Sequence, residues 1–503
     1  MIKRAFTFGI LLGWLLVGWS QQQVDAPFSG EKMRADLQLF RSIREAANSG
    51  VYKYRTSAQM DSLYQWAFQQ IEVSETLLDF FNILWVITDF EGSLHNGLTL
   101  SPKVAEHLRN EAKGYFPYPI KIIRGHVLIN TSEATIPLAS EIHTINGHPI
   151  REIIRQLGKY YTTDGFNKTG KEIGINANFG IYYRLTYGKS ETFRVEYTLP
   201  DTKKIRQISL PGTSYRNNRQ AFYRRHSKVL DSLSYEGDEP IPYHYRKITP
   251  EIGALRISSF SIGGNEHAPA HKAYVGFLDS LFTVIQSEPI QHLIVDVRAN
   301  GGGSDPNDLV TYSYLTDRSF MENKEAWVSF QTPPYWKHNK ETRLLGKYLE
   351  KRAYQNIMAD DFPEQRGDRY YQDETSDDHL VRYPSPNAFT GNIYLLVSPR
   401  TASAGSLFAA MVAGDQHTTV IGRETQGGYY GHNGHVPIRY RLPHSRIKFM
   451  FSVVNLQQDV LPKEGQLNGR GIMPDHEVEQ TVSDFINHRD AVLMFTLDHI
   501  QKQ

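Results

Sequence analysis

The most informative absence in this chain of 503 residues is cysteine, because the sequence contains none. The absence excludes disulfide bonds, thiolate metal sites, a cysteine nucleophile and a lipid anchor on cysteine. The 19 histidines show no His-Glu-x-x-His or comparable spacing. The sequence therefore predicts neither a metal site nor a cofactor.

An excess of either charge is also lacking. The chain has 55 Lys and Arg against 54 Asp and Glu, which gives a net charge of +1 at pH 7. This balance gives no reason to expect nucleic acid or an anionic membrane surface as a partner. The Arg-rich stretch 212–242 is interpreted as a linker, because few aromatic residues are interleaved with its arginines.

A long apolar run is missing too, although a short one lies near the N-terminus at residues 6–18. Lys3 and Arg4 precede it, and small residues follow it just before Gln21. This order is typical of a signal peptide. We predict a signal peptide at 1–20, an exported protein of the periplasm, cell envelope or medium, and no stable membrane insertion after cleavage. An uncleaved anchor is the alternative.

The rest of the chain is organised around a predicted strand that leads into a predicted helix. Ile393–Val397 is a short apolar run typical of a buried strand, and Leu407, Phe408 and Met411 then recur at helical spacing. Ser403 therefore lies at a predicted helix N-terminus, where free N–H groups can stabilise a negative oxygen. A serine that merely caps the helix would give the same pattern.

A second predicted strand, His292–Arg298, runs into Asn300 and the triplet Gly301–Gly303. Glycines let the backbone approach a ligand closely and turn its N–H groups inward. A plain tight turn would also explain the triplet.

Three motifs follow one another in the order Arg-x-Asn-Gly-Gly-Gly, Thr401-Ala-Ser-Ala404 and Gly469-Arg-Gly-Ile-Met-Pro-Asp475. Together they resemble the C-terminal-processing (tail-specific) and tricorn-core serine peptidases. The resemblance implies a ClpP/crotonase-like α/β peptidase domain and peptides or unfolded proteins as substrates. It also implies Ser403 as nucleophile and an oxyanion hole made by Ala404 with Gly302 or Gly303.

The motifs identify the general base less directly than the nucleophile. In tail-specific peptidases a Lys follows the nucleophile, but the matching position here is Gly428. The tricorn-like branch places a histidine on a turn after a helix, and His95 is the match, with a longer gap before it and Asn96 where Thr is usual. We therefore predict His95 as the base, with His432 and His435 as alternatives.

The acid of the tricorn-like branch aligns with Asn468, so the nearby Glu464 is predicted to take its place. Two classes of function stay open. Ser403 and the glycine triplet favour a serine endopeptidase. The missing Lys and the altered acid leave room for a non-catalytic relative that binds a peptide or a hydrophobic ligand, as the retinoid-binding relatives do.

The predicted fold class is multidomain, α+β with α/β. Residues 21–118 carry helical periodicity, and 119–211 resemble a PDZ-like domain around Ser140–Ile150. Such domains bind peptide ends by strand addition, and a β-rich spacer is the alternative. The peptidase domain is predicted at 243–503, with a long insertion at 318–388 interpreted as a partly ordered excursion near the cleft and a candidate lid.

Two further elements are predicted in the peptidase domain. Ile252–Ile257, Ala273–Val284 and Leu293–Val297 alternate as strand, helix and strand, which predicts a βαβ unit. Ser483–Ile500 is predicted to be one amphipathic helix that covers the sheet.

Overall fold

The computed structural model describes residues 23–503 except 133–134, 227–240, 304–305 and 341–342. The predicted signal peptide at 1–20 lies outside the described residues. Among the helices of the described part, none has the length and apolar character needed to span a membrane.

A six-stranded sheet forms the centre of the peptidase domain, in the order β18-β15-β14-β10-β9-β8. All its neighbouring strands pair in parallel except β8, which is antiparallel to β9. The strands are β8 (Tyr243–Lys247), β9 (Ile252–Ile257), β10 (His292–Asp296), β14 (Asn392–Val397), β15 (Thr418–Gly422) and β18 (His476–Glu477).

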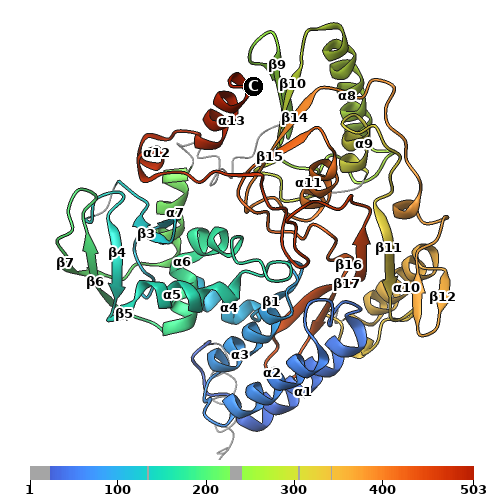
Figure 1. Cartoon of the computed structure of the whole chain (residues 1–503). Coiled ribbons are helices and arrows are strands. Elements are labelled where there is room, and N and C mark those ends of the chain that lie inside the picture. Colours follow the sequence, from blue (N-terminus) through green and yellow to red (C-terminus); the bar gives the residue numbers. More distant parts are fainter. Residues whose placement is uncertain (1–22, 133–134, 227–240, 304–305, 341–342) are drawn as a thin grey trace, which may run out of the picture.

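Helices cover both faces of this sheet (Figure 1). Leu293 and Val295 pack with the helices of one face, whereas Ile294 packs with the C-terminal helix on the other, because successive strand residues point to opposite sides. The first face carries α8 (Pro269–Ser287), α9 (Asn307–Ser313) and α11 (Ala404–Gly414), and the second carries α13 (Ala491–Gln501).

The predicted βαβ unit is confirmed as β9, α8 and β10. The single predicted C-terminal helix is wrong, because the structure has α12 (Val482–Asn487) followed by α13. His488 takes a left-handed backbone with φ 57°, which ends the first helix. Asp490 then starts the second, since its side chain accepts a hydrogen bond from the N–H of Leu493.

The second sheet joins segments that are far apart in the sequence. Its order is β1-β17-β11-β13-β12, and β16 also pairs with β17. The strands are β1 (Gly97–Thr99), β11 (Asn323–Val328), β12 (Glu364–Arg366), β13 (Arg369–Tyr371), β16 (Asn433–Arg441) and β17 (Lys448–Gln458). The N-terminal helical segment thus shares a sheet with the peptidase domain through β1.

The insertion at 318–388 is more extensively structured than the predicted excursion, because β11 is hydrogen-bonded within the second sheet. It also contributes β12, β13, helix α10 (Leu344–Asp361) and the short 3₁₀ turns η3 (Trp336–His338) and η4 (Asp377–His379).

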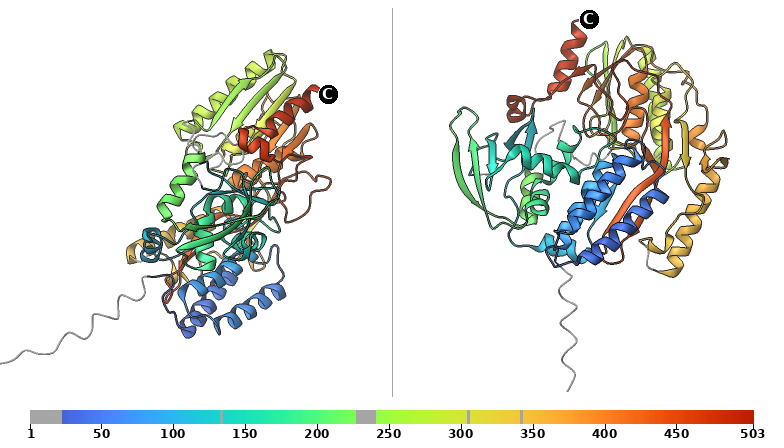
Figure 2. Two further views of the ribbon diagram at one scale, coloured as in Figure 1. Left: turned by 90° about the vertical axis from the view of Figure 1, so that its left-hand side faces the viewer. Right: turned by 60° about the horizontal axis from the view of Figure 1, so that its bottom comes forward.

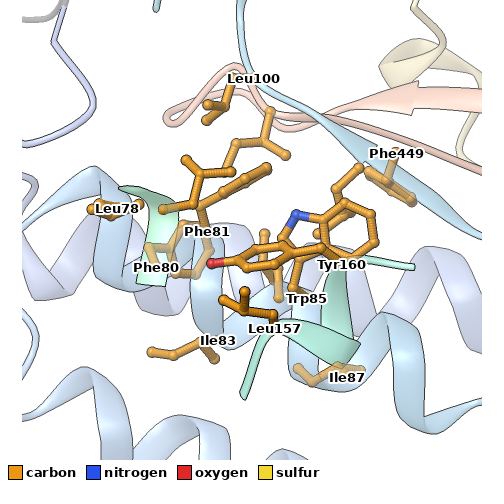
Figure 3. Packing of buried hydrophobic residues seen from close by; sticks show 14 of the residues in the cluster. Leu78, Phe80, Phe81, Ile83, Trp85, Ile87, Leu100, Leu157, Tyr160 and Phe449 are labelled. Atoms are coloured by element: carbon orange, nitrogen blue, oxygen red, sulfur yellow. The ribbon is translucent and has the colours of Figure 1, made fainter. Parts of the chain in front are cut away.

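The N-terminal helices are coloured blue in Figure 2, and the first of them packs against β17. They are α1 (Gly30–Ala47), α2 (Ser57–Ile71), α3 (Leu77–Phe90) and α4 (Pro102–Asn110). Phe40 of α1 lies 4.8 Å from Phe449 of β17, and Trp85 of α3 lies 5.7 Å from Tyr160 of the middle domain, measured between ring centroids. Figure 3 shows Trp85, Tyr160 and Phe449 together in one apolar cluster that links all three parts of the chain.

The middle domain is a sheet in the order β2-β3-β4-β6-β7, with β5 on β4. The predicted turn at Asn146 and Gly147 is confirmed, since both have positive φ, 52° and 83°. The strands are β2 (Ile120–Ile123), β3 (His126–Ile129), β4 (Glu141–Ile145), β5 (His148–Pro149), β6 (Thr192–Thr198) and β7 (Arg206–Pro211). The helices are α5 (Ile150–Leu157), η2 (Gly158–Tyr160) and α6 (Lys171–Tyr187). Helix α7 (Tyr215–His226) lies within the stretch interpreted as a linker and contacts α6 and α4, so this part of the stretch is helical and packed.

The β2 edge of this sheet is covered by the chain itself. The N–H of Ile122 donates to Asn176 Oδ1 of α6 at 2.9 Å, and the N–H of Arg124 donates to Glu479 Oε1 at 2.9 Å. These two donors are therefore occupied, which favours the spacer interpretation over peptide capture at β2.

Candidate active site

Ser403 lies at the N-cap of α11, as predicted, with the unusual backbone angles φ 51° and ψ −133°. Such a conformation is strained for a residue with a side chain and is concentrated at functional sites. The glycine loop lies against it, since a Cβ placed on Gly302 would stand 2.8 Å from Ser403 Cβ. Only glycine fits there, and Gly302 also has a positive φ of 110°.

The predicted oxyanion donors differ in their availability. The N–H of Gly302 donates to Asn300 Oδ1 at 2.9 Å, so it already has a partner. Ala404 is the first residue of α11, where N–H groups have no carbonyl partner within the helix. A Cβ on Gly302 would lie 3.2 Å from Ala404 N, which places this N–H beside the glycine loop. Ala404 and the exposed Gly303 therefore stay the predicted donors.

His95 lies at Ser403, although 308 positions separate them in the sequence. The distance from His95 Nε2 to Ser403 Oγ is 3.3 Å, and that from His95 Nδ1 to the carbonyl oxygen of Asn433 is 2.7 Å. Because a carbonyl oxygen only accepts, Nδ1 carries the proton and Nε2 is left to accept from the serine hydroxyl. This is the tautomer that a general base requires.

The surroundings keep this imidazole neutral. Burial lowers the pKa of His95 to about 4, and the charge of His435 acts in the same direction, while the bond to Asn433 opposes them. At neutral pH the ring is therefore unprotonated and able to accept a proton from Ser403.

The two alternative bases have other surroundings. The His432 ring is buried 5.2 Å from the His95 ring, and burial holds its pKa well below the usual value. His435 Nε2 lies 3.2 Å from Glu322 Oε1, and its Nδ1 lies 3.7 Å from Asp378 Oδ2. These three side chains each offer one possible metal-ligand atom, and these atoms all lie within 4.8 Å of one another. The two ring nitrogens of His435 thus face different carboxylates rather than Ser403.

The predicted acid, Glu464, does not contact the predicted base, His95. Glu464 is exposed in a turn, and His95 Nδ1 faces the Asn433 carbonyl instead. The role of Glu464 stays a prediction without a contact to support it. Sequence reasoning missed Asn433 because every residue offers a backbone carbonyl, so the sequence carries no signal for this one.

The departures from the family motifs have structural reasons. Asn96, where Thr is usual, donates to Glu91 Oε2 at 2.9 Å, and Glu91 is in turn ion-paired with the buried Arg44. A Cβ on Gly428, the position of the missing Lys, would lie 2.8 Å from the carbonyl oxygen of Gly431. A lysine would therefore not fit this backbone.

The match to a peptidase family and the position of Ser403 against the glycine loop identify a serine-type peptidase, which acts on peptides or proteins. Residues 251–478 match the model of peptidase family S41, so this part of the chain resembles the C-terminal-processing and tricorn-like serine peptidases, as the three motifs predicted. No curated protein matches the sequence.

Two solved structures share the fold over almost the whole chain. Mature CPAF complexed with lactacystin is 14% identical, with 94% of this chain and 98% of that chain covered and a TM-score of 0.60. The crystal structure of mature CPAF is also 14% identical, with 94% and 97% covered and a TM-score of 0.57. The N-terminal and middle parts therefore belong to the shared architecture along with the peptidase domain.

Proposed function

We propose that the protein is an exported serine endopeptidase in which His95 is the general base for Ser403. The observation that carries this proposal is the contact of His95 Nε2 with Ser403 Oγ at 3.3 Å, with Nδ1 occupied by the Asn433 carbonyl. The bond at Nδ1 fixes both the tautomer and the direction of the ring.

The reaction follows from these positions. Ser403 Oγ attacks the carbonyl carbon of the scissile peptide bond while His95 Nε2 takes the hydroxyl proton. The N–H groups of Ala404 and Gly303 stabilise the oxyanion, and one such donor typically contributes ~3 kcal/mol. His95 then gives the proton to the leaving amine, and water releases the acyl group from Ser403 by the same steps.

Peptides and unfolded proteins are the proposed substrates, because these are the substrates implied by the resemblance of the three motifs to the C-terminal-processing peptidases. Export rests on the basic, apolar and small-residue order of residues 1–20. The proposed location is the periplasm, the cell envelope or the medium.

A fluorophosphonate probe tests the nucleophile directly. We expect the purified chain to be labelled, Ser403→Ala to lose labelling and casein hydrolysis, and Ser62→Ala, on the exposed face of α2, to keep both. Lactacystin is a second probe, since the solved CPAF complex contains it. A wild type that binds casein without labelling or cleaving it would contradict the proposal and favour a binding protein.

A further inference from the structure

Residues 161–170 of the middle domain, here called the bridging loop, lie between the segment that carries the base and the loops of the peptidase domain. On one side the N–H of Gly165 donates to the carbonyl of Gly92 at 2.8 Å. On the other side the N–H of Phe166 donates to the carbonyl of Gly469 at 2.7 Å. The bridging loop is therefore hydrogen-bonded to both halves of the site.

Asp164 lies at the centre of the bridging loop and is completely buried. Its Oδ1 accepts from the N–H of Leu94 at 2.9 Å, and its Oδ2 accepts from the N–H of Gly428 at 3.0 Å. Leu94 directly precedes His95. One carboxylate thus connects the segment of the base with the loop that follows β15.

That loop is in turn attached to the nucleophile's segment. The N–H of Gln426 donates to the carbonyl of Thr401 at 3.0 Å, two residues before Ser403. On the side of the base, Thr162 Oγ1 lies 3.2 Å from the carbonyl oxygen of Leu94 and 3.0 Å from that of Asn96. Hydrogen bonds from the bridging loop therefore reach both neighbours of His95 and, through Gln426, the approach to Ser403.

We propose that Asp164 is the positioning residue of this site, whose ionised carboxylate aligns the His95 segment with the Ser403 segment. The proposal rests on the Ser403–His95 pair of the proposed function. An ionised carboxylate suits the place because both oxygens accept, and the two groups that face them are both N–H donors. An asparagine would turn an NH₂ group toward one of these donors and lose that bond.

The same chemistry makes the alignment sensitive to pH. Burial raises the pKa of Asp164 to about 7, opposed by the N–H groups of Leu94 and Gly428 and by the charge of Lys53. Tyr54 is a further titratable group close to the carboxylate, and its hydroxyl donates to the carbonyl of Gly431. A protonated Asp164 has an O–H in place of one acceptor and loses one of its two bonds.

Asp164 and His95 are expected to titrate in different ranges. Because the pKa of His95 is lowered to about 4, the base is neutral throughout the range in which Asp164 loses its proton. Burial lowers the pKa of Lys53 to about 8, so a rise in reactivity near pH 7 is assigned to Asp164 only where Asp164→Asn removes it.

The test compares the full mature chain with Asp164→Asn and with Asp201→Asn, a matched change at an exposed site of the same domain. The rate of Ser403 labelling by a fluorophosphonate is measured from pH 5 to 9. We expect the wild-type rate to rise through pH ~7. We expect Asp164→Asn to be 10- to 100-fold slower at pH 8, since ~1 Å of misplacement costs up to that factor, and to lack the rise. Asp201→Asn should follow the wild type.

Hydrogen exchange gives a readout that needs no activity. Corrected for intrinsic exchange, peptides containing Leu94 and Gly428 should exchange faster at pH 8 in Asp164→Asn than in the wild type, because the variant leaves one of the two N–H groups without its acceptor. Equal protection in the two proteins, or an unchanged pH profile of labelling in Asp164→Asn, would overturn the proposal. Slower exchange in the wild type than in Asp164→Asn, together with a wild type that is never labelled, would instead refute the peptidase function while Asp164 still aligned the two segments.

Discussion

At the scale of single residues, Ser403 and His95 depend on each other, because the 3.3 Å contact gives the hydroxyl its only histidine acceptor among the described residues. We expect Ser403→Ala and His95→Ala each to lower kcat by about 10⁴-fold or more, and the double variant to be little worse than either. Hydrolysis of a fluorogenic peptide measures this, with His417→Ala at an exposed position as control. Turnover that survived His95→Ala would place the base elsewhere.

The raised pKa of Asp164 also predicts how the stability of the protein depends on pH. Its pKa is raised from 3.8 to about 7 in the folded protein, so between these values the folded state binds more protons than the unfolded chain. The contribution of Asp164 to the free energy of unfolding is then present at low pH and is lost as pH rises toward 7.

We therefore expect the free energy of unfolding of Asp164→Asn, relative to the wild type, to increase between pH 4 and 7 by up to about 1.4 kcal/mol per pH unit and to level off above. Urea unfolding at several pH values measures the difference. His95 titrates in both proteins, so its contribution cancels from the difference in the free energy of unfolding. A difference that did not vary with pH would contradict the raised pKa of Asp164.

At the scale of elements, three glycines meet where the bridging loop contacts its neighbours. A Cβ on Gly165 would lie 2.2 Å from the carbonyl oxygen of Gly469, and a Cβ on Gly92 would lie 2.6 Å from that of Gly165. All three have positive φ, between 60° and 73°. The backbones of the three parts of the chain therefore touch directly, with no side chain between them.

Gly165→Ala should therefore separate these backbones and slow the labelling of Ser403 by at least about tenfold. Gly125→Ala is the matched control, because Gly125 has a φ of 79° but nothing within 4 Å of an added Cβ. Both variants carry the left-handed backbone cost of about 1–2 kcal/mol, so slower labelling of Gly165→Ala, and any thermal destabilisation beyond that of Gly125→Ala, is assigned to the separated backbones. Equal labelling would show that the contact does not matter.

The sequence predicted the strands and helices whose own residues carry a local apolar or helical pattern. β9, β10, β14 and α11 follow from apolar runs and helical spacing, and Ser403 follows from the point where β14 gives way to α11. The second sheet could not be predicted, since β1 has only three residues and pairs Gly97 with Met450. Contacts over such separations leave no local pattern.

The residues of the site likewise divide into those that the sequence predicted and those that it could not predict. His95 and Ser403 came from motifs, whereas the Asn433 carbonyl and the contacts of Asp164 did not, because they use backbone groups that every residue has. The predicted Glu464 failed to find support for a related reason: a carboxylate was expected where the structure offers a carbonyl oxygen.

At the scale of the whole molecule, the predicted signal peptide decides where the peptidase works. We expect the native protein to begin near Gln21, because the basic and apolar segments before it resemble those removed on export. Intact-mass measurement of protein from its native host, after separation of envelope, medium and cytosol, tests this. Retention of residues 1–20 in the mature protein would show an anchor instead.

The contact of Gly92, Gly165 and Gly469 also has a consequence for when activity appears during synthesis of the chain. The chain is made from its N-terminus, so His95 emerges early, Ser403 much later, and Gly469 later still. A nascent chain that ends between Ser403 and Gly469 would contain both His95 and Ser403. It would lack the contact of Gly469 with the bridging loop. Such a chain should be inert toward its neighbours on the ribosome, and the newly made peptidase should acquire activity only after Gly469 has been synthesised.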